Sequence, residues 1–124
     1  MESFKLTWHR FPRFIEAREF FRGKGCIYLQ ADSTENVLRV GESDDPWERY
    51  KGGTAYALDA AGHNSGNLYF FAEVIGESQA RKLLEANLIF DLQPRYNNQH
   101  KKRPPGVRVQ YCHAGDVPKA LLKQ

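Results

Sequence analysis

The stretch GCIYLQADSTENVLRVG, residues 25–41, contains two strand-like segments separated by a short polar turn. Residues 25–31 are rich in β-branched and aromatic side chains, and residues 37–41 return with the same character. Asp32 and Asn36, which lie between them, are typical turn residues. Because this connection is too short for a crossover, the two strands are expected to pair antiparallel as a hairpin.

Helical segments are predicted on both sides of this hairpin. Residues 13–22 have the apolar spacing of an amphipathic helix. Residues 43–53, SDDPWERYKGG, predict a short helix that Asp44 or Asp45 caps and a proline opens. The small residues of the following segment, 54–66, are compatible with either a short helix or a loop.

The second half of the chain adds two strands and two helices. Residues 67–76, NLYFFAEVIG, are apolar through most of their length, which is typical of a central, buried strand. A helix from about 79 to 92 follows, capped by Ser78 and ended by Pro94. Residues 107–112 alternate like an edge strand, and a short helix closes the chain. The predicted fold is α+β: a small antiparallel sheet of three core strands, with an extra C-terminal edge strand, flanked by helices.

Length and composition set broad limits on the class of protein. The chain has 124 residues, so residues 1–124 are expected to form one domain with a modest core. No apolar run approaches the ~20 residues that span a bilayer, and the N-terminus lacks the pattern of a secretory signal, so no membrane partner is expected. Two cysteines, Cys26 and Cys112, are too few for a disulfide scaffold, which favours a cytoplasmic protein. With His113 they lack zinc-site spacing and are expected to be buried or idle thiols.

The charge pattern bears on the partner. The net charge is +3, from 18 Lys and Arg against 15 Asp and Glu, which is a mild excess. The cations gather in two stretches, one made of Arg10, Arg13, Arg18, Arg22 and Lys24 and the other of Arg95, Lys101, Lys102 and Arg103. Clustered cations favour a polyanion such as nucleic acid. A solvated basic surface explains the charge pattern equally well.

Five side chains supply a set of groups suited to phosphodiester hydrolysis. Tyr28 and Arg39 lie on the hairpin, Arg49 lies in the short helix, and Glu85 and Asn97 belong to the long helix and its end. A carboxylate can hold a divalent metal, a guanidinium can neutralise a phosphate, and a phenol can help to deprotonate water. Residue types alone make this only a suggestion, because any domain of this size holds several such groups.

The order and spacing of the motifs narrow the interpretation. Ten residues separate Tyr28 from Arg39, Arg49 follows Gly41 by eight positions, and LLEANLIFDLQPRYN (83–97) contains a helical glutamate, Leu-Ile, a proline and an asparagine. In this order the chain resembles the GIY-YIG nuclease superfamily, whose two name motifs lie on the two strands of a hairpin. The elements that carry the resemblance are Cys26-Ile27-Tyr28, Arg39-Val40-Gly41, Arg49, Glu85, Leu88-Ile89, Pro94 and Asn97, so it covers about residues 23–98.

The resemblance implies a metal-dependent endonuclease that cleaves DNA, with one Mg²⁺ or Mn²⁺ ion. It assigns Tyr28 the role of assisting or acting as general base, Arg49 contact with the scissile phosphate, Glu85 the metal ligand and Asn97 a supporting role. A stand-alone enzyme of this kind, without a separate recognition domain, is expected to cut according to DNA structure or with low sequence specificity.

The chain also departs from the motif pattern. Arg39 stands where the second motif has a tyrosine, Cys26 stands where the first has a glycine, and Glu42 and Gly53 stand where many members have a lysine and a tyrosine or histidine. These departures support an alternative, a catalytically weakened domain that binds nucleic acid or a protein without cutting it. A third interpretation is a structural α+β module whose match is accidental. The residues expected to contact nucleic acid are Arg39, Tyr50, Lys51, Arg95, Lys101 and Lys102.

Overall fold

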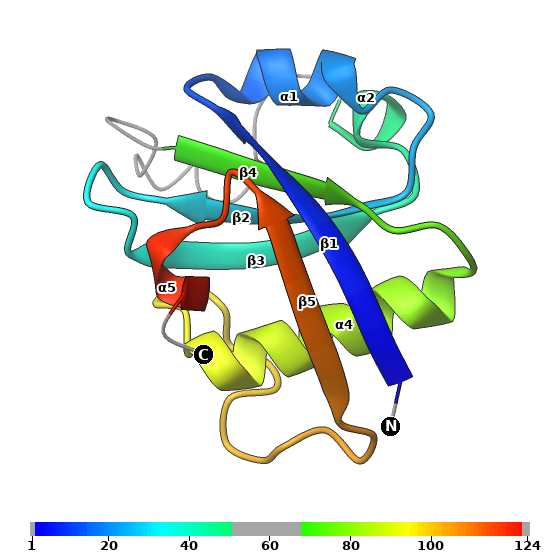
Figure 1. The fold of residues 1–124 in the computed structure, drawn as a ribbon, viewed down its shortest axis with the longest axis vertical. Helices are drawn as coiled ribbons and strands as arrows, with labels where there is room; N and C mark the ends of the chain where they lie inside the picture. Colours follow the sequence, from blue (N-terminus) through cyan, green and yellow to red (C-terminus); the bar gives the residue numbers. More distant parts are fainter. Residues whose placement is uncertain (1, 51–67, 123–124) are drawn as a thin grey trace.

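The structure is a computed structural model in which residues 2–50 and 68–122 are described. The described part contains a mixed sheet with helices on both of its faces (Figure 1). In chain order the elements are β1 (Glu2–Phe11), α1 (Phe14–Phe20), β2 (Cys26–Ala31), β3 (Val37–Ser43), α2 (Pro46–Arg49), β4 (Leu68–Glu73), α4 (Ser78–Leu92), β5 (Val109–Gly115) and α5 (Lys119–Leu122). The α+β class is therefore confirmed. The predicted alternatives for residues 54–66 fall outside the described residues.

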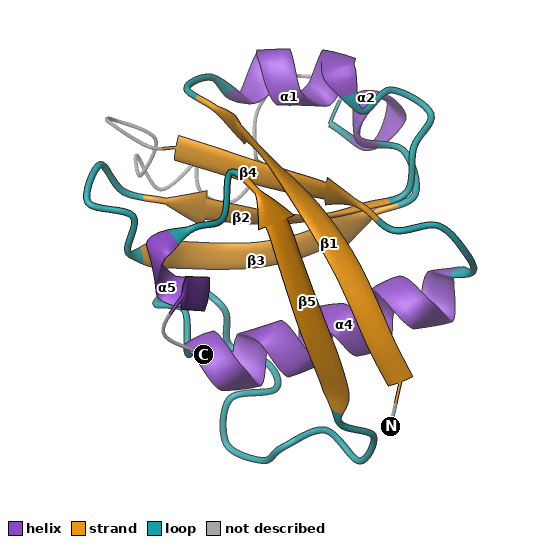
Figure 2. Ribbon diagram, viewed as in Figure 1, coloured by secondary structure: helices purple, strands orange, loops and turns teal. Residues whose placement is uncertain are grey.

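The five strands are arranged in the order β3-β2-β4-β1-β5 (Figure 2). β2 pairs antiparallel with both β3 and β4, so the hairpin and the central position of β4 are as predicted. β4 pairs antiparallel with β1, but β1 and β5 run parallel. The three antiparallel core strands are therefore as predicted, but the whole sheet is mixed, because the edge strand pairs with an N-terminal strand that the prediction omitted.

The N-terminal strand β1 is the element that sequence reasoning missed. Its side chains alternate: Leu6 and Trp8 are buried, whereas Lys5 and Thr7 are exposed. This period of two is the ordinary signal of a half-buried strand. Phe4, Leu6 and Trp8 alternate with polar residues in the sequence, so the signal was present and was overlooked.

The sheet has a core on each face. On one face, Leu84 and Leu88 of α4 pack against a cluster that includes Leu6, Trp8 and Leu29. On the other face, α1 and α2 cover an aromatic cluster, which consists of Phe14, Ala17, Phe21, Cys26, Tyr28, Tyr50, Tyr69 and Phe71. Burial of both faces explains why β2 and β4 read as continuous apolar runs rather than alternating ones.

Element boundaries agree with local sequence signals, with small differences. The Asp45 side chain caps α2 by accepting a hydrogen bond from the backbone N–H of Trp47 at 3.0 Å. α4 begins at Ser78 itself, so Ser78 is not the cap, and Glu77 occupies that position without a side-chain cap hydrogen bond. At its other end α4 finishes at Leu92, and Gln93 adopts a left-handed conformation. Across residues 2–50 and 68–122, no helix combines the length and the apolar character that crossing a bilayer requires.

Candidate active site

A polar groove lies at the outer edge of β3 and gathers residues from four parts of the chain. It encloses about 310 Å³. β3 supplies Arg39, α2 supplies Arg49 and α4 supplies Glu85. The complete lining is Arg39, Val40, Arg49, Glu85, Ile89, Tyr96, Asn97, Asn98 and Gln99. Four of the predicted site residues, Arg39, Arg49, Glu85 and Asn97, are therefore neighbours around one groove.

Asn97 fixes one wall of this groove to the edge of the sheet. Its Oδ1 accepts a hydrogen bond from the backbone N–H of Val40 at 2.8 Å, and its Nδ2 donates to the backbone oxygen of Val40 at 3.0 Å. The backbone N–H of Tyr96 donates to the oxygen of Leu38 at 2.9 Å. The carboxamide thus takes the place of a paired strand, so Asn97 supports the groove and leaves ligand contacts to its neighbours.

The loop that carries this wall is closed by two hydrogen bonds between its ends. Gln93 Nε2 donates to the backbone oxygen of Lys101 at 3.0 Å, and Lys101 Nζ donates to the backbone oxygen of Pro94 at 2.7 Å. Closing the loop in this way limits the conformations available to Asn98 and Gln99, which lie within it. Sequence reasoning treated Lys101 as a phosphate contact and overlooked Gln93, whose closure role no local pattern signals.

Glu85 projects from α4 into the groove and lies in a partly desolvated, electrostatically mixed environment. Burial, with the nearby carboxylate of Glu42 as a second cause, raises its pKa to about 7. Arg39, Arg49 and a hydrogen bond from the backbone N–H of Glu42 oppose this increase. Arg39 and Arg49 line the same groove as Glu85, and with its pKa raised to about 7 the Glu85 carboxyl can accept either a proton or a cation near neutral pH.

Glu42 connects two arginines near the site. Its Oε2 lies 3.0 Å from Nε of the buried Arg81, and its Oε1 lies 4.0 Å from Nη1 of Arg49. Arg49 Nη1 also donates to the backbone oxygen of Glu42 at 3.2 Å. These contacts aim the Arg49 side chain, which is 55% exposed, along the edge of β3. The signal that could have revealed Arg81 is its spacing, because it lies one helical turn before Glu85.

Tyr28 is absent from the groove lining and belongs to the aromatic cluster on the face of the sheet that α1 and α2 cover. It is 1% exposed, it stacks on Phe71 with ring centroids 5.1 Å apart, and its hydroxyl lies 2.7 Å from that of Tyr50. A Cβ added to Gly41 would lie 2.3 Å from Tyr28 Cζ, so the glycine makes room for the ring at the strand edge. Burial and then the neighbouring Tyr50 raise the pKa of Tyr28 well above its usual value, while Arg39 and Arg49 oppose this.

The residues expected to contact nucleic acid have different surroundings. Arg39 lines the groove, and Lys102 lines an adjacent hollow that shares Asn98 with it. Arg95 is exposed, with its guanidinium 5.9 Å from the ring of Tyr96. Tyr50 is buried and its hydroxyl is hydrogen-bonded to that of Tyr28, so little of its side-chain surface is available to contact nucleic acid. Lys51 lies outside the described residues.

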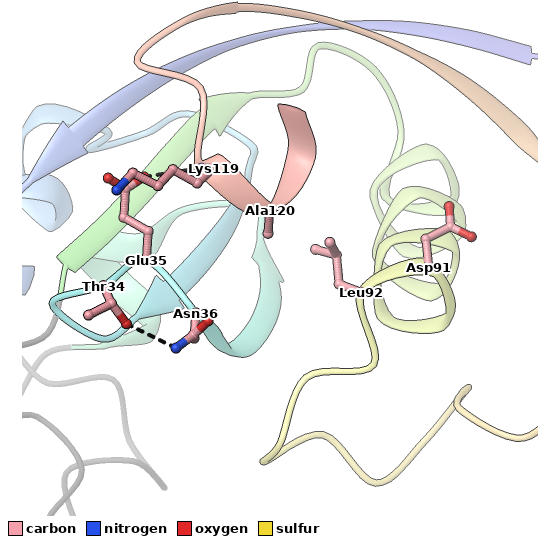
Figure 3. A pocket seen from close by; sticks show the side chains of 7 residues that line it. All are labelled: Thr34, Glu35, Asn36, Asp91, Leu92, Lys119 and Ala120. Atoms are coloured by element: carbon pink, nitrogen blue, oxygen red, sulfur yellow. Dashed lines mark hydrogen bonds between the residues drawn. The ribbon is translucent and has the colours of Figure 1, made fainter. Parts of the chain in front are cut away.

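A separate hollow of about 270 Å³ lies between the β2–β3 turn, the end of α4 and α5 (Figure 3). Its two carboxylates are engaged: Asp91 accepts hydrogen bonds from Arg108 and Tyr111, and Glu35 accepts one from the backbone N–H of Lys119. It shares no lining residue with the groove. Because its carboxylates are occupied by internal hydrogen bonds, this hollow is a weaker candidate for a catalytic site than the groove at β3.

The zinc alternative has no geometric support. Cys26 is buried in β2 and its pKa is raised to about 12, mainly by burial, whereas Cys112 is exposed on β5. Two strands separate β2 from β5 in the sheet. Among the described residues, no group of three or more His, Cys, Asp or Glu side chains is placed to hold a metal.

Comparisons of the chain with protein-family models, with curated proteins and with solved structures found no match.

Proposed function

We propose that this protein is a metal-dependent endonuclease that hydrolyses DNA phosphodiester bonds, with structure-directed or low sequence specificity. The observation that carries the proposal is the groove at β3, where a carboxylate and two guanidinium groups from three different elements face the same open space. A phosphodiester needs its negative charge neutralised during attack, and positioned guanidinium groups do this without reorganisation. The resemblance of the motif order to GIY-YIG nucleases points to the same chemistry.

The groove has donors that suit a divalent cation once a phosphate is bound. Glu85 offers one carboxylate, and the exposed Asn98 and Gln99 offer side-chain carbonyl oxygens along the same wall. Mg²⁺ usually keeps several water ligands and binds one or two carboxylates together with substrate phosphates. A single carboxylate is therefore compatible with its coordination preference. Such a cation, when bound, would polarise the scissile phosphate and lower the pKa of an attacking water.

The chain's own residues then divide the remaining tasks. Arg49 and Arg39 bind and orient the phosphate, and Arg49 is kept on the groove side by its contacts with Glu42. Tyr28 and Tyr50 act as a hydrogen-bonded phenol pair beside these arginines. Because burial stabilises the neutral phenol, we assign the pair to orienting a water or relaying its proton rather than to standing as a free phenolate base.

A nicking assay on supercoiled plasmid with Mg²⁺ or Mn²⁺ tests the proposal. Glu85→Ala should abolish cleavage, Tyr28→Phe should reduce it strongly, and Arg49→Ala should lower the rate roughly 10²–10³-fold, as expected for loss of a charge-stabilising group. Lys82→Ala is the control, because Lys82 is an exposed cation outside the groove lining and outside both cationic stretches. Cleavage that persists in Glu85→Ala, or that falls equally in the control, would refute the assignment.

The second candidate is a catalytically weakened domain that binds nucleic acid or a protein partner. Two observations favour it: Arg39 stands where the motif has a tyrosine, and the hydroxyl of Tyr28 is buried against Tyr50. Binding of a labelled DNA that survives Glu85→Ala and Tyr28→Phe, without cleavage at any concentration of either metal, would establish this candidate in place of the enzyme.

A further inference from the structure

The long connection between α4 and β5, residues 93–108, concentrates positive charge. It contains five Lys or Arg residues and no Asp or Glu, whereas the whole chain has a net charge of only +3. The remaining residues together are therefore net negative, and an anionic partner is attracted to this connection. Figure 1 shows it as a long loop that runs from the end of α4 to the start of β5.

A basic hollow of about 400 Å³ lies in this connection, beside the groove at β3. Two prolines form part of its wall, and its polar side chains are Asn98, His100, Lys101, Lys102 and Arg103. Among the described residues that line it, none has a carboxylate. Asn98 also lines the groove. The two spaces are therefore adjacent, and a chain of phosphates that enters the groove can continue into the hollow.

Contacts at both ends of the connection hold the wall of the hollow in place. Near its start, Lys101 Nζ donates to the backbone oxygen of Pro94 at 2.7 Å. Near its end, Asn87 Nδ2 of α4 donates to the backbone oxygen of Val107 at 3.0 Å. None of these contacts uses the side chains of Lys102 or Arg103. The hollow is thus built by other residues, and these two cations are left to meet a ligand.

The cations of the connection differ in what they already contact. Lys101 is bonded to a backbone carbonyl, and Arg108 Nη2 lies 2.6 Å from Oδ1 of Asp91. Lys102 and Arg103 are exposed, and within residues 2–50 and 68–122 no carboxylate lies within ion-pair distance of either. An incoming anion therefore has no internal ion pair to displace at these two side chains.

We propose that the basic hollow binds backbone phosphates of the DNA strand beyond the phosphate held in the groove, through Lys102 and Arg103. The inference rests on the proposed function in taking DNA as the substrate, and it adds the direction in which the strand leaves the groove. Phosphate contacts position a nucleic acid without reading its bases. The substrate class is therefore any DNA strand that extends past the cleaved bond on this side, whatever its sequence.

The groove next to the hollow favours DNA over an acidic peptide as the occupant. Arg39 and Arg49 line the groove, and Lys102 and Arg103 line the hollow that adjoins it. A nucleic-acid backbone carries a negative charge at every nucleotide, so it matches successive cations along a path. Lys101 has a different task, because its bond to the Pro94 carbonyl makes it a positioning residue for the wall.

Binding of a fluorescein-labelled DNA duplex, measured by anisotropy in EDTA over a salt series, counts the phosphate contacts. Lys102→Ala/Arg103→Ala should lower the slope of log Kd against log salt by about 1.8, because each contact contributes about 0.9. It should also weaken binding roughly tenfold or more at about 0.1 M salt. Lys5→Ala/Lys82→Ala removes the same charge at exposed positions outside both linings and should leave the slope nearly unchanged.

Two further variants separate charge from structure. Lys102→Arg/Arg103→Lys keeps both charges and should keep the wild-type slope. Lys101→Ala should lower the melting temperature, because it removes the bond to Pro94, whereas Lys102→Ala/Arg103→Ala should leave the melting temperature unchanged. Circular dichroism verifies that each variant folds.

Cleavage assays distinguish a failure of this inference from a failure of the proposed function. On supercoiled plasmid, Lys102→Ala/Arg103→Ala should raise KM and leave kcat within about twofold, because the phosphate contact is the same in the ground and transition states. Hydrolysis of bis(p-nitrophenyl) phosphate, which occupies the groove alone, should be unchanged. Binding that depends on the hollow in a protein that cleaves neither substrate refutes the nuclease proposal and retains this inference.

Three results of the binding assay overturn the inference. The first is a wild-type slope in Lys102→Ala/Arg103→Ala, and the second is an equal loss of slope in Lys5→Ala/Lys82→Ala. The third is a protein that does not bind DNA at any salt concentration. A loss of affinity that differs between duplexes of unrelated sequence also overturns it, because it would show that the hollow reads bases.

Discussion

Replacing Glu85 with glutamine should stabilise the folded protein at high pH while removing its proposed activity. The carboxyl is partly buried in α4 near Glu42, and its pKa is raised from 4.5 to about 7, first by burial. The glutamine side chain is neutral at every pH, so it would avoid the cost of holding a charge there. Its amide oxygen could still accept the hydrogen bond that the backbone N–H of Glu42 donates.

The direction of this pH dependence of stability follows from proton linkage. The folded state binds the Glu85 proton more tightly than the unfolded chain, so this group's stabilisation is fully present below a pH of about 4.5. It is lost as the pH rises through about 7. The pKa difference corresponds to about 3 kcal/mol for a fully desolvated group. Because Glu85 is partly exposed, solvent screening reduces this, and we expect the variant to gain about 1–2 kcal/mol at pH 8.5.

Guanidinium unfolding followed by tryptophan fluorescence, at pH 4.5 and pH 8.5, measures this effect. The gain should appear at pH 8.5 and shrink to a few tenths of a kcal/mol at pH 4.5. Glu73→Gln, at an exposed position at the end of β4, is the control and should show no such pH dependence. A gain of equal size at both pH values, or no gain at pH 8.5, would contradict the reasoning about the desolvated carboxyl.

Three further substitutions test the architecture of the groove. Asn97→Ala leaves the N–H and C=O of Val40 without their partners and should cost about 1–3 kcal/mol of unfolding free energy, measured by chemical denaturation. Gly41→Ala places a methyl group 2.3 Å from Tyr28 Cζ and should lower stability by about 1–3 kcal/mol and displace the ring, which near-ultraviolet circular dichroism would detect. Arg49→Ala should change stability by less than about 0.5 kcal/mol, as at other exposed positions, while it lowers plasmid nicking.

Each of these substitutions has a matched control in the chain. Asn98→Ala removes a neighbouring exposed carboxamide and should leave stability nearly unchanged. Gly106→Ala adds a methyl group where nothing lies within 4 Å and should not reproduce the loss caused by Gly41→Ala. Lys82→Ala, at an exposed cation outside the groove, should leave both stability and nicking nearly unchanged. A control that behaves like its test variant would show that the groove contacts are not responsible.

The sequence by itself determined the elements whose signals are local. The 25–41 hairpin follows from two strand-forming segments joined by an Asp-initiated turn too short for a crossover. The buried character of β4 and the long helix α4 follow from continuous apolar residues and from helical spacing. The motif order predicted that Arg49 and Glu85 would belong together, and the groove brings them together.

Only the tertiary structure decided what depends on contacts between distant residues. β1 pairs parallel with β5 across almost the whole chain, so no local pattern could have revealed the mixed sheet. The pKa of Glu85 depends on burial and on Glu42, which lies on another element. The residue expected to act as, or assist, the general base, Tyr28, likewise turned out to be buried with its hydroxyl paired to that of Tyr50. Local propensity acts over neighbouring residues, whereas desolvation and charge coupling arise only when packing has placed groups from separate elements side by side.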